Sequence, residues 1–350
     1  MCIIYVLTTK CLKGSDNVKV VVIGSGSWGT GLAQTLCDND VDVTIYGNDE
    51  NEINDINEQH RNSKYFGDTE LHPALHATTD INVVKGCDVV VLVIPTIAVE
   101  GVCKQIDSLL DKKAIIVNAS KGFHPKTFDR MSNVIRESLS PEHLSSVVSL
   151  IGPSHAEEVI IRMITTISAV SLNESDAKII QELFSNNYMR VYTGTDEIGS
   201  EIGAAVKNAI AVASGTLYGL GYGDNTRAAL ITRGLMEMTR YGVALGGKPE
   251  TFMGLTGIGD LIVTCTSKHS RNFQAGYDIG KHNSAEYFWD NNIKTVEGVR
   301  TAKAVYESAK RLGIDMPIVN EIYKVLYEGK SPDTSAMDLM LRDLKSEIDF

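Results

Sequence analysis

Lys19-Val-Val-Val-Ile-Gly-Ser-Gly-Ser-Trp-Gly29 is the stretch of sequence that decides the fold. Its first five residues form an apolar run, which predicts a buried strand that ends at Gly24. Gly24, Gly26 and Gly29 then have the spacing GxGxxG, at the point where a strand gives way to a helix. In this context the first glycine permits a tight turn, the second lets a pyrophosphate approach the backbone, and the third allows close helix–strand packing. The stretch therefore predicts dinucleotide binding, and the alternative is a glycine turn with only a structural role.

The segments that follow repeat the alternation of strand and helix. A helix is expected from about Trp28 to Cys37, and its free N–H groups would face the phosphates. Further apolar strands are expected at Val41–Tyr46, Asp88–Ile94, Ala114–Asn118 and Val147–Ile151. Continuous apolar strands between helices are typical of a parallel sheet covered on both faces, the doubly wound α/β Rossmann fold.

The character of the chain changes at about Thr193, after which strand-like runs disappear and helical segments dominate. The sequence therefore predicts an N-terminal extension over residues 1–17 and a dinucleotide-binding Rossmann domain with a mainly parallel sheet over residues 18–193. An all-helical domain for substrate binding and catalysis is expected over residues 194–350.

Composition excludes several classes of protein. The formal net charge of −11 argues against a nucleic-acid-binding or anionic-membrane surface, although a local basic pocket for a small anion remains possible. The six cysteines form no CxxC pair and no zinc-ligand spacing, so no metal site is expected and a reducing compartment is favoured. No apolar run reaches the ~18 residues that span a bilayer. The expected location is the cytoplasm.

The end of the second strand, Tyr46-Gly-Asn-Asp49, bears on the choice of cofactor. An acid at this place holds the ribose 2′-hydroxyl of NAD, and a basic residue accepts the 2′-phosphate of NADP. Asn48 is neutral, and Asp49 lies late for a ribose contact. The sequence slightly favours NAD over NADP.

Two loops follow apolar strands at the edge of the sheet where ligands bind in open α/β folds. Ser120-Lys-Gly122 places Lys121 there, either as a ligand contact or as a surface lysine. Gly152-Pro-Ser-His-Ala156 has the form of a tight loop around a ligand. His155 is an acid–base candidate in this loop, but a structural role is the more common one for a loop histidine.

Lys207-Asn208 lies in a helical run of small residues, Glu201-Ile-Gly-Ala-Ala-Val-Lys-Asn-Ala-Ile-Ala211. Gly203, Ala204 and Lys207 are three or four positions apart and share one helix face. Such a face lets another backbone come close, but taken alone this segment favours a solvated surface lysine. The dinucleotide-binding motif before it and the anion-binding motif after it make Lys207 the leading catalytic candidate.

Two later motifs offer groups that suit a phosphorylated substrate. Gly257-Ile-Gly-Asp260 is expected to be a glycine-rich loop that presents the carboxylate of Asp260. Ser270-Arg-Asn272 combines a guanidinium fork with two neutral donors, and forks suit phosphate oxygens. Ser270 is also suited to cap a helix, and both roles are compatible.

Taken together, these motifs resemble the bacterial-type NAD(P)-dependent glycerol-3-phosphate dehydrogenases. The resemblance covers about Val18 to Ala336. It rests on seven segments: 24–30, Ala119-Ser-Lys-Gly122, Gly152-Pro-Ser154, Gly203-Ala-Ala-Val-Lys-Asn208, Asn225 to Gly234, Gly257-Ile-Gly-Asp-Leu261 and Ser270-Arg-Asn272.

The resemblance implies a role for each matched residue. Cofactor contacts would come from Gly24, Gly26, Ser27, Trp28, Gly29, Asn48, Lys121, Ala156, Arg271, Thr295 and Glu297. Substrate contacts would come from Lys121, Gly152, Ser154, Lys207, Asp260, Ser270, Arg271 and Asn272. Lys207 would be the proton acceptor in alcohol oxidation, and Asp260 would orient Lys207 or a substrate hydroxyl. The resemblance also implies a homodimer, a small phosphorylated substrate and supply of glycerol 3-phosphate for glycerophospholipid synthesis.

The chain departs from the family pattern at four places. His155 stands where the family usually has an aromatic residue, and Arg162-Met-Ile-Thr165 where it usually has Gly-x-Pro-Thr. Asn62-Ser-Lys-Tyr-Phe-Gly67 replaces Asn-x-x-Tyr-Leu-Pro, and a basic residue is absent at Asn48. The departures concern the loops beside the nicotinamide and the cofactor preference.

The sequence thus predicts an oxidoreductase that interconverts sn-glycerol 3-phosphate and dihydroxyacetone phosphate with NAD or NADP. One rival is a different two-domain dehydrogenase that acts on a hydroxyacid or sugar acid, which the triplet at residues 270–272 disfavours. The other is a nucleotide-sensing protein without catalysis, which would be expected to lack Lys207 or Asn208.

Overall fold

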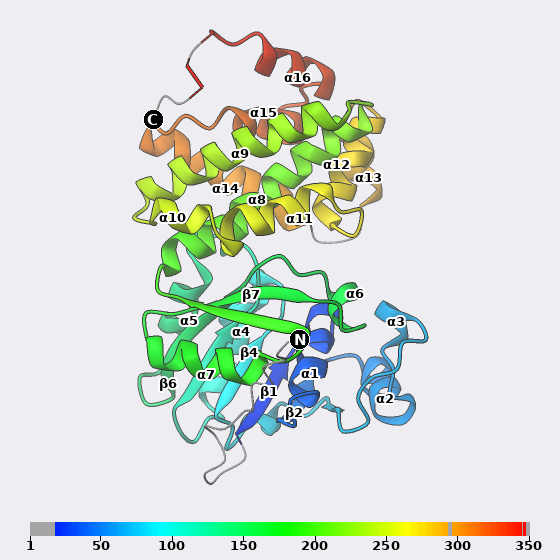
Figure 1. The fold of residues 1–350 in the computed structure, drawn as a ribbon, viewed down its shortest axis with the longest axis vertical. Coiled ribbons are helices and arrows are strands. Elements are labelled where there is room, and N and C mark those ends of the chain that lie inside the picture. Colours follow the sequence, from blue (N-terminus) through cyan, green and yellow to red (C-terminus); the bar gives the residue numbers. More distant parts are fainter. Residues whose placement is uncertain (1–17, 293–295, 345, 348–350) are drawn as a thin grey trace, which may run out of the picture.

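The computed structural model describes residues 18–292, 296–344 and 346–347. Two parts are stacked along the long axis of the molecule: an α/β part, and a helical part above it (Figure 1). The strands are β1 (Lys19–Ile23), β2 (Asp42–Tyr46), β3 (His76–Thr78), β4 (Val89–Leu92), β5 (Ala114–Asn118), β6 (Leu144–Ile151), β7 (Thr165–Val170) and β8 (Met189–Gly194). In the described residues after Gly194, every element is helical.

The eight strands form one sheet in the order β3-β2-β1-β4-β5-β6-β7-β8. All neighbours pair in parallel except β6 and β7, which are antiparallel. The strand order reverses between β1 and β4, and open α/β sheets bind ligands at this point. The predicted doubly wound, mainly parallel sheet is therefore confirmed.

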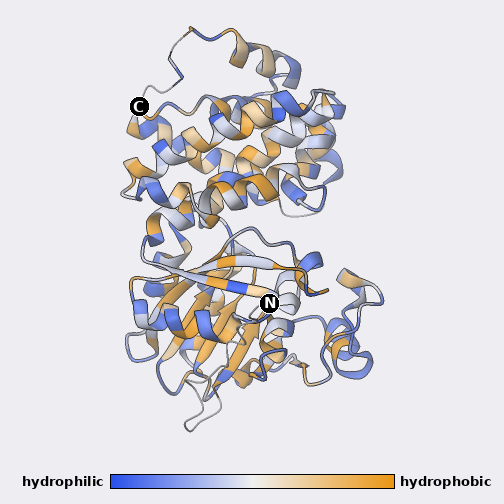
Figure 2. Cartoon of the chain, viewed as in Figure 1, coloured by the Kyte–Doolittle hydropathy of each residue, from blue (hydrophilic) through white to orange (hydrophobic). Residues whose placement is uncertain are grey.

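The helices of the α/β part cover both faces of the sheet. They are α1 (Ser27–Cys37), α2 (Glu50–Gln59), α3 (Ser63–Phe66), η1 (Ile81–Val84), α4 (Thr96–Asp107), α5 (Met131–Ser138), α6 (Ala156–Val159) and α7 (Glu174–Phe184). Val20 and Val22 pack with Leu32 and Leu36 of α1, whereas Val21 packs on the other face against α4. Figure 2 shows these strands as mainly apolar.

The sequence predicted β1 and β5 at their observed bounds, and β2, β4 and β6 within a few residues. It missed β3, β7 and β8. These strands are short or alternate between apolar and polar residues, as in Met189-Arg-Val-Tyr-Thr-Gly194, because each lies at or near an edge of the sheet.

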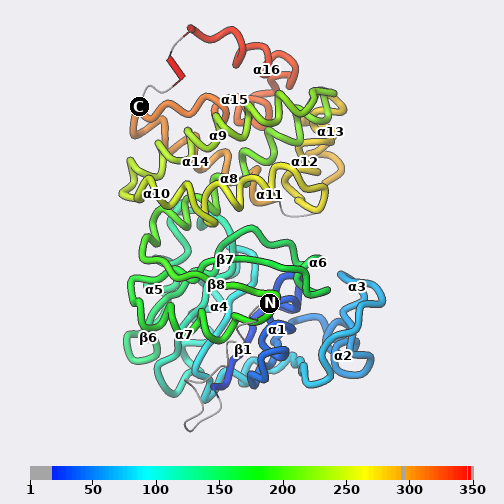
Figure 3. Tube along the Cα trace, viewed as in Figure 1, coloured from blue at the N-terminus to red at the C-terminus, as the bar shows by residue number. Residues whose placement is uncertain are grey.

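The helical part is built around the long helix α8. Its helices are α8 (Glu197–Gly219), α9 (Asp224–Ala244), α10 (Pro249–Phe252), the π-helical turn η2 (Leu255–Gly259), α11 (Asp260–Thr266), α12 (Arg271–Lys281), α13 (Glu286–Asn291), α14 (Glu297–Leu312), α15 (Pro317–Tyr327) and α16 (Pro332–Met340). The Cα trace in Figure 3 passes from green at α8 to red at α16 without returning to the α/β part. No described helix combines the length and apolar character needed to cross a membrane.

Glycines bring α8 and α12 into backbone contact. A Cβ on Gly215 would lie 2.0 Å from the carbonyl oxygen of Phe273, and a Cβ on Gly276 would lie 2.0 Å from that of Val212. Gly280 has the same relation to Thr216. The close crossing fixes the start of α12, where Ser270, Arg271 and Asn272 lie, beside the middle of α8.

We predict that Gly276→Ala destabilises the protein by about 1–3 kcal/mol, because the added methyl must push two helix backbones apart. The free energy of unfolding in urea measures the effect. Gly101→Ala is the matched control: Gly101 lies on the exposed side of α4, and a Cβ there meets no atom within 4 Å. The control should be neutral or slightly stabilising, since alanine favours helix over glycine. If Gly276→Ala and Gly101→Ala had equal free energies of unfolding, the close backbone contact between α8 and α12 would be contradicted.

Candidate active site

Lys207 lies in the middle of α8 and is buried, with 4% of its surface exposed. Its Nζ donates hydrogen bonds to Asp260 Oδ1 at 2.5 Å and to Thr264 Oγ1 at 2.9 Å. The alternative of a solvated surface lysine is therefore wrong. Burial lowers the pKa of Lys207 to about 8; the neighbouring Lys121 acts in the same direction, and Asp260 opposes it. An amine with this pKa can both give and take a proton near neutral pH.

The small-residue face of α8 creates this burial. A Cβ on Gly203 would lie only 2.5 Å from the carbonyl oxygen of Thr256, so η2 packs directly on the α8 backbone. The segment over Gly257-Ile-Gly-Asp260 is thus not the loop that the sequence predicted. It is the end of a π-helical turn, and Asp260 begins α11. The widened turn directs the Asp260 carboxylate at Lys207, consistent with the frequent use of π-turns at functional sites.

Lys121 joins the same cluster from the α/β part. Its Nζ donates to the carbonyl oxygen of Gly152 at 3.2 Å and lies 3.5 Å from Asp260 Oδ2. Asp260 Oδ2 is buried and has no hydrogen-bond partner among the described residues. The structure therefore brings together Lys207, Asp260, Lys121 and Gly152, which the sequence placed in four separate motifs. Ser154 lies two residues beyond and donates to the carbonyl oxygen of Gly152 at 3.2 Å.

The triplet at the start of α12 lies beside Asn208. Asn272 Nδ2 donates to Asn208 Oδ1 at 2.9 Å, and Ser270 Oγ caps α12 by accepting from the Phe273 N–H at 3.2 Å, as predicted. The exposed guanidinium of Arg271 forms no hydrogen bond or ion pair with any described residue. A guanidinium fork that lacks a partner among the described residues, at a helix N-terminus, is a suitable anion-binding arrangement.

The glycine loop has the geometry that a dinucleotide requires. Gly24 has a φ of +122°, and a Cβ on Gly29 would lie 1.9 Å from the Gly24 carbonyl oxygen. In contrast, no atom lies within 4 Å of the place where a Cβ on Gly26 would be, so the backbone there is open to a ligand. Ser27 and Trp28 begin α1 above this opening, and Trp28 Nε1 is buried without a partner in the described chain. These residues fit a dinucleotide.

Asn62 supports the glycine loop from a distant part of the sequence, and sequence reasoning missed this role. Its buried Nδ2 donates at 2.9 Å to the Ser25 carbonyl oxygen and at 2.9 Å to Thr30 Oγ1. It therefore fixes the glycine loop from α3's side, across 37 residues of sequence. In the sequence, the segment Asn62–Gly67 stands out only as a departure from a family pattern.

Near the end of β2, where the cofactor ribose is expected, the structure places a cation that β2 itself does not supply. Asn48 accepts from the Tyr46 hydroxyl at 2.8 Å, and Asp49 caps α2 by accepting from the Asn51 N–H at 3.0 Å. Lys64 of α3 lies 3.3 Å from Asp49 and 2.5 Å from Glu52. The charge of Asp49 is thus offset by a lysine 15 residues away, which the local sequence could not indicate.

The remaining predicted cofactor residues lie around the start of α14. Glu297 begins this helix, and its carboxylate lies beside Gly122, whose added Cβ would be 3.2 Å from Oε2. Burial raises the pKa of Glu297. Ala156 is buried at the start of α6, and Thr295 lies outside the described residues.

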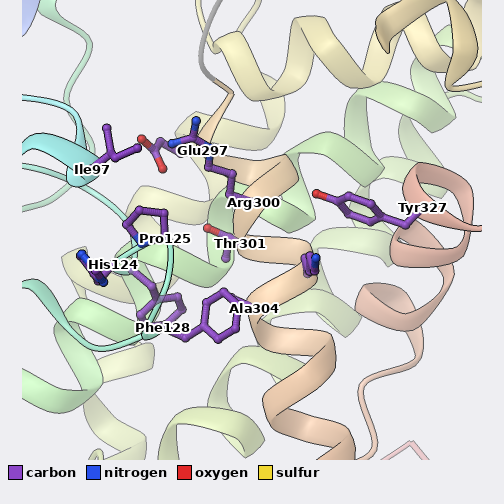
Figure 4. Close-up of a pocket in the computed structure, with 11 residues that line it drawn as sticks. Ile97, His124, Pro125, Phe128, Glu297, Arg300, Thr301, Ala304 and Tyr327 are labelled. Carbon is purple, nitrogen blue, oxygen red and sulfur yellow. The ribbon is translucent and has the colours of Figure 1, made fainter.

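A pocket of about 270 Å³ borders this region. It is lined by Ile97, Phe123, His124, Pro125, Phe128, Glu297, Arg300, Thr301, Lys303, Ala304 and Tyr327. Figure 4 shows Glu297 and Ile97 at one end of the pocket and Tyr327 at the other. The pocket touches the predicted cofactor site through Glu297 alone, and it does not include Lys207 or Asp260.

His155 lies where the two parts of the molecule meet, with its ring 5.9 Å from that of His269. Its Nε2 is buried and unpartnered among the described residues, and burial lowers its pKa. Arg162, the second departure, points elsewhere: it forms a two-contact ion pair with Asp38 at 2.8 and 2.9 Å. The unusual turn is therefore tied to the end of α1.

Comparison with known proteins agrees with this geometry. The family model for the N-terminus of NAD-dependent glycerol-3-phosphate dehydrogenase matches residues 19–177, and the model for the C-terminus matches residues 196–337. Glycerol-3-phosphate dehydrogenase [NAD(P)+] of Enterococcus faecalis is 48% identical over 333 residues, or 95% of this chain and 98% of that protein. The Listeria monocytogenes protein of the same name is 49% identical over 330 residues, covering 94% and 98%.

A solved structure is also similar. The crystal structure of glycerol-3-phosphate dehydrogenase from Coxiella burnetii superposes with a TM-score of 0.86 at 31% identity, covering 93% of this chain and 99% of that one. The match includes both the sheet and the helical part. The chain therefore belongs to the NAD-dependent glycerol-3-phosphate dehydrogenase family.

Proposed function

We infer that this cleft interconverts sn-glycerol 3-phosphate and dihydroxyacetone phosphate with NAD or NADP, with Lys207 as the proton donor and acceptor. The observation that carries the inference is the buried lysine with a pKa of about 8, held by Asp260 and Thr264 beside Lys121. The nicotinamide, when bound, supplies or takes the hydride at the substrate carbon.

Lys207 manages the proton that accompanies this transfer. In reduction its ammonium polarises the C2 carbonyl and protonates the developing alkoxide. In oxidation the neutral amine takes the hydroxyl proton. Asp260 holds the Lys207 ammonium in one orientation through the 2.5 Å contact. Its second oxygen, Oδ2, lacks a hydrogen-bond partner among the described residues and is positioned to accept from a substrate hydroxyl.

The substrate is held from both sides of the cleft. Lys121, Gly152 and Ser154 contact it from the strand ends of the sheet, and Ser270, Arg271 and Asn272 take its phosphate from α12. The support for this division is the Arg271 guanidinium, which has no hydrogen bond or ion pair within the described part of the chain, and the contact between Asn272 and Asn208. Fixing both ends of a small molecule contributes to rate through proximity and orientation.

The cofactor is held by the glycine loop and the residues around it. We assign these contacts to Gly24, Gly26, Ser27, Trp28, Gly29, Asn48, Lys121, Ala156, Arg271, Thr295 and Glu297. The open backbone at Gly26 supports the pyrophosphate position, and the buried Glu297 beside Gly122 supports a contact near the nicotinamide.

The wider assignments rest on family membership. We propose that residues 18–193 bind the cofactor and residues 194–350 carry substrate binding and catalysis. We also propose that the protein works in the cytoplasm as a homodimer and supplies glycerol 3-phosphate for glycerophospholipid synthesis. Sedimentation analysis tests the dimer directly.

We predict that Lys207→Ala lowers kcat for dihydroxyacetone phosphate reduction by roughly 10²–10⁴-fold, because general acid catalysis is lost. Titration of NADH binding should give a nearly unchanged Kd, since Lys207 contacts the substrate. Lys281→Ala, an exposed lysine at the end of α12, is the control and should behave as wild type. More than about a tenth of wild-type kcat in Lys207→Ala would remove Lys207 from the mechanism.

The pKa of Lys207 gives a second prediction with a definite sign. Reduction needs the ammonium, so kcat/KM for dihydroxyacetone phosphate should fall as pH rises through about 8. Oxidation needs the free amine, so kcat/KM for sn-glycerol 3-phosphate should rise through the same pH. Both profiles are measured with wild-type enzyme across pH 6 to 10. If kcat/KM changed in the same direction with rising pH for both reactions, a single shared lysine could not be the proton donor and acceptor.

We predict that Arg271→Ala weakens recognition of the phosphate. Charge-assisted hydrogen bonds contribute about 1.5–3 kcal/mol each, so the apparent affinity for dihydroxyacetone phosphate should fall at least tenfold. The slow reaction with dihydroxyacetone, which lacks the phosphate, should change little. Arg311→Ala, at the exposed end of α14, is the control. An equal loss on both substrates would show that Arg271 serves the cofactor or the fold alone.

The ribose contacts predict the choice of cofactor. Asn48 offers no cation, so NADH should be used at least as well as NADPH, as judged by kcat/KM in one buffer. Asn48→Arg should shift the ratio toward NADPH, because it adds a fork for the 2′-phosphate. Lys64→Ala should shift it further toward NADH, because it uncovers the charges of Asp49 and Glu52. Kd values from calorimetry should follow the same order, and a tenfold wild-type preference for NADPH would refute the assignment.

A further inference from the structure

Glu201 is a buried carboxylate with no part in the mechanism above. It lies in the second turn of α8, 6% exposed, at the junction between the helical part and the sheet. It accepts five hydrogen bonds, and all of them come from the α/β part. A carboxylate with so many donors is an anchor between the two parts.

Two of these donors lie on β5 and β6, the strands that lead into the loops with Lys121 and Gly152. Asn118 Nδ2, at the end of β5, donates to Glu201 Oε1 at 3.4 Å, and Ser149 Oγ of β6 donates to the same oxygen at 3.2 Å. Asn118 is three residues before Lys121, and Ser149 is three residues before Gly152. Glu201 thus holds the two strand ends that precede two predicted substrate contacts.

The amide of Asn118 extends this contact into the loop itself. Its Oδ1 accepts from the Ser120 N–H at 3.1 Å, while its Nδ2 faces Glu201. Because a carboxylate only accepts, Glu201 determines which end of the amide faces the loop. Ser120 Oγ in turn donates to the Ile94 carbonyl oxygen at 2.7 Å, so Ser120 is held through both its backbone and its side chain.

Lys121 then completes the path to the catalytic lysine. Its Nζ lies 3.5 Å from Asp260, which holds Lys207 on the same helix as Glu201. We propose that Glu201, acting through the Asn118 amide, is a positioning residue that aligns Lys121 with the Asp260–Lys207 pair across the two parts of the protein. This inference rests on the proposed roles of Lys121 and Lys207.

Glu197, one turn earlier on α8, provides a matched comparison. It is also buried, and it accepts from Arg136 at 2.8 and 2.5 Å and from Arg130 at 3.1 Å. These arginines lie in α5 and at its N-cap. Glu197 therefore fastens the same interface, but none of its hydrogen bonds reaches β5 or β6.

The test is a double-mutant cycle with Lys121→Ala, read as kcat/KM for dihydroxyacetone phosphate. Glu201→Ala alone should lower kcat/KM at least about tenfold, because small displacements of positioned groups cost up to about a hundredfold. In the Lys121→Ala background the same change should cost less than about threefold, since its target is gone. Glu201→Gln should restore most of the rate, because its carbonyl oxygen can still accept from Asn118 and Ser149.

Glu197→Ala is the control, and its effect should multiply with that of Lys121→Ala. A second readout is the pH profile of reduction, set by Lys207 among the charges of Asp260 and Lys121 and near Cys265. With Lys121 displaced, the limb near pH 8 should move to higher pH in Glu201→Ala and stay in place in Glu197→Ala. Asn118→Ala breaks the same path with Glu201 intact, and it replaces Glu201→Ala in the cycle if that variant does not fold.

The proposal would be overturned if the losses from Glu201→Ala and Lys121→Ala simply multiplied in the double variant. It would also be overturned if the pH profile of Glu201→Ala kept its limb near pH 8. Either result would make Glu201 a purely structural anchor. A wild-type rate in Lys121→Ala would also overturn it, because a residue without effect needs no alignment. That outcome would leave the role of Lys207 to its own variant, so failure of the positioning proposal and failure of the proposed function are distinguishable.

Discussion

The backbone of α8 is the constraint on which the rest of the structure depends. Three other elements approach it so closely that a Cβ at the contact would collide with a carbonyl oxygen: η2 at Gly203, α12 at Gly215 and α14 at Gly298. Each approach delivers a part of the site. Asp260 follows η2, the triplet that we propose to bind the phosphate lies at the start of α12, and Glu297 begins α14. Small residues on α8 and α14 thus bring these parts together.

Burial on α8 also sets the chemistry. Removing an ion pair from water costs free energy that the attraction between the charges only partly offsets, so Lys207 and Asp260 are poor contributors to stability. The same desolvation lowers the pKa of Lys207 to about 8. Perturbed groups of this kind gather at functional sites, and here the cause is the close packing of η2 over the lysine.

Sequence reasoning succeeded where one local pattern contains the whole signal. The apolar run before GxGxxG fixed β1 and the glycine turn, and the small-residue face around Lys207 indicated close packing. It failed where a residue acts through tertiary contacts. Lys64, Asn62 and Glu201 occur in ordinary helical segments, and their partners lie 12 to 83 residues away. It also took the π-helical turn before Asp260 for a loop, because glycine suits both and only the packing on Gly203 selects the turn.

The backbone contact between α8 and α12 also limits which substitutions this chain can accept. Every replacement of glycine adds at least one carbon atom, and at Gly215, Gly276 and Gly280 the nearest carbonyl oxygen already occupies that space. No first step away from glycine is therefore neutral at these places, whereas Gly101 is free to drift. A change of specificity by substitution would therefore have to come from side chains away from this crossing.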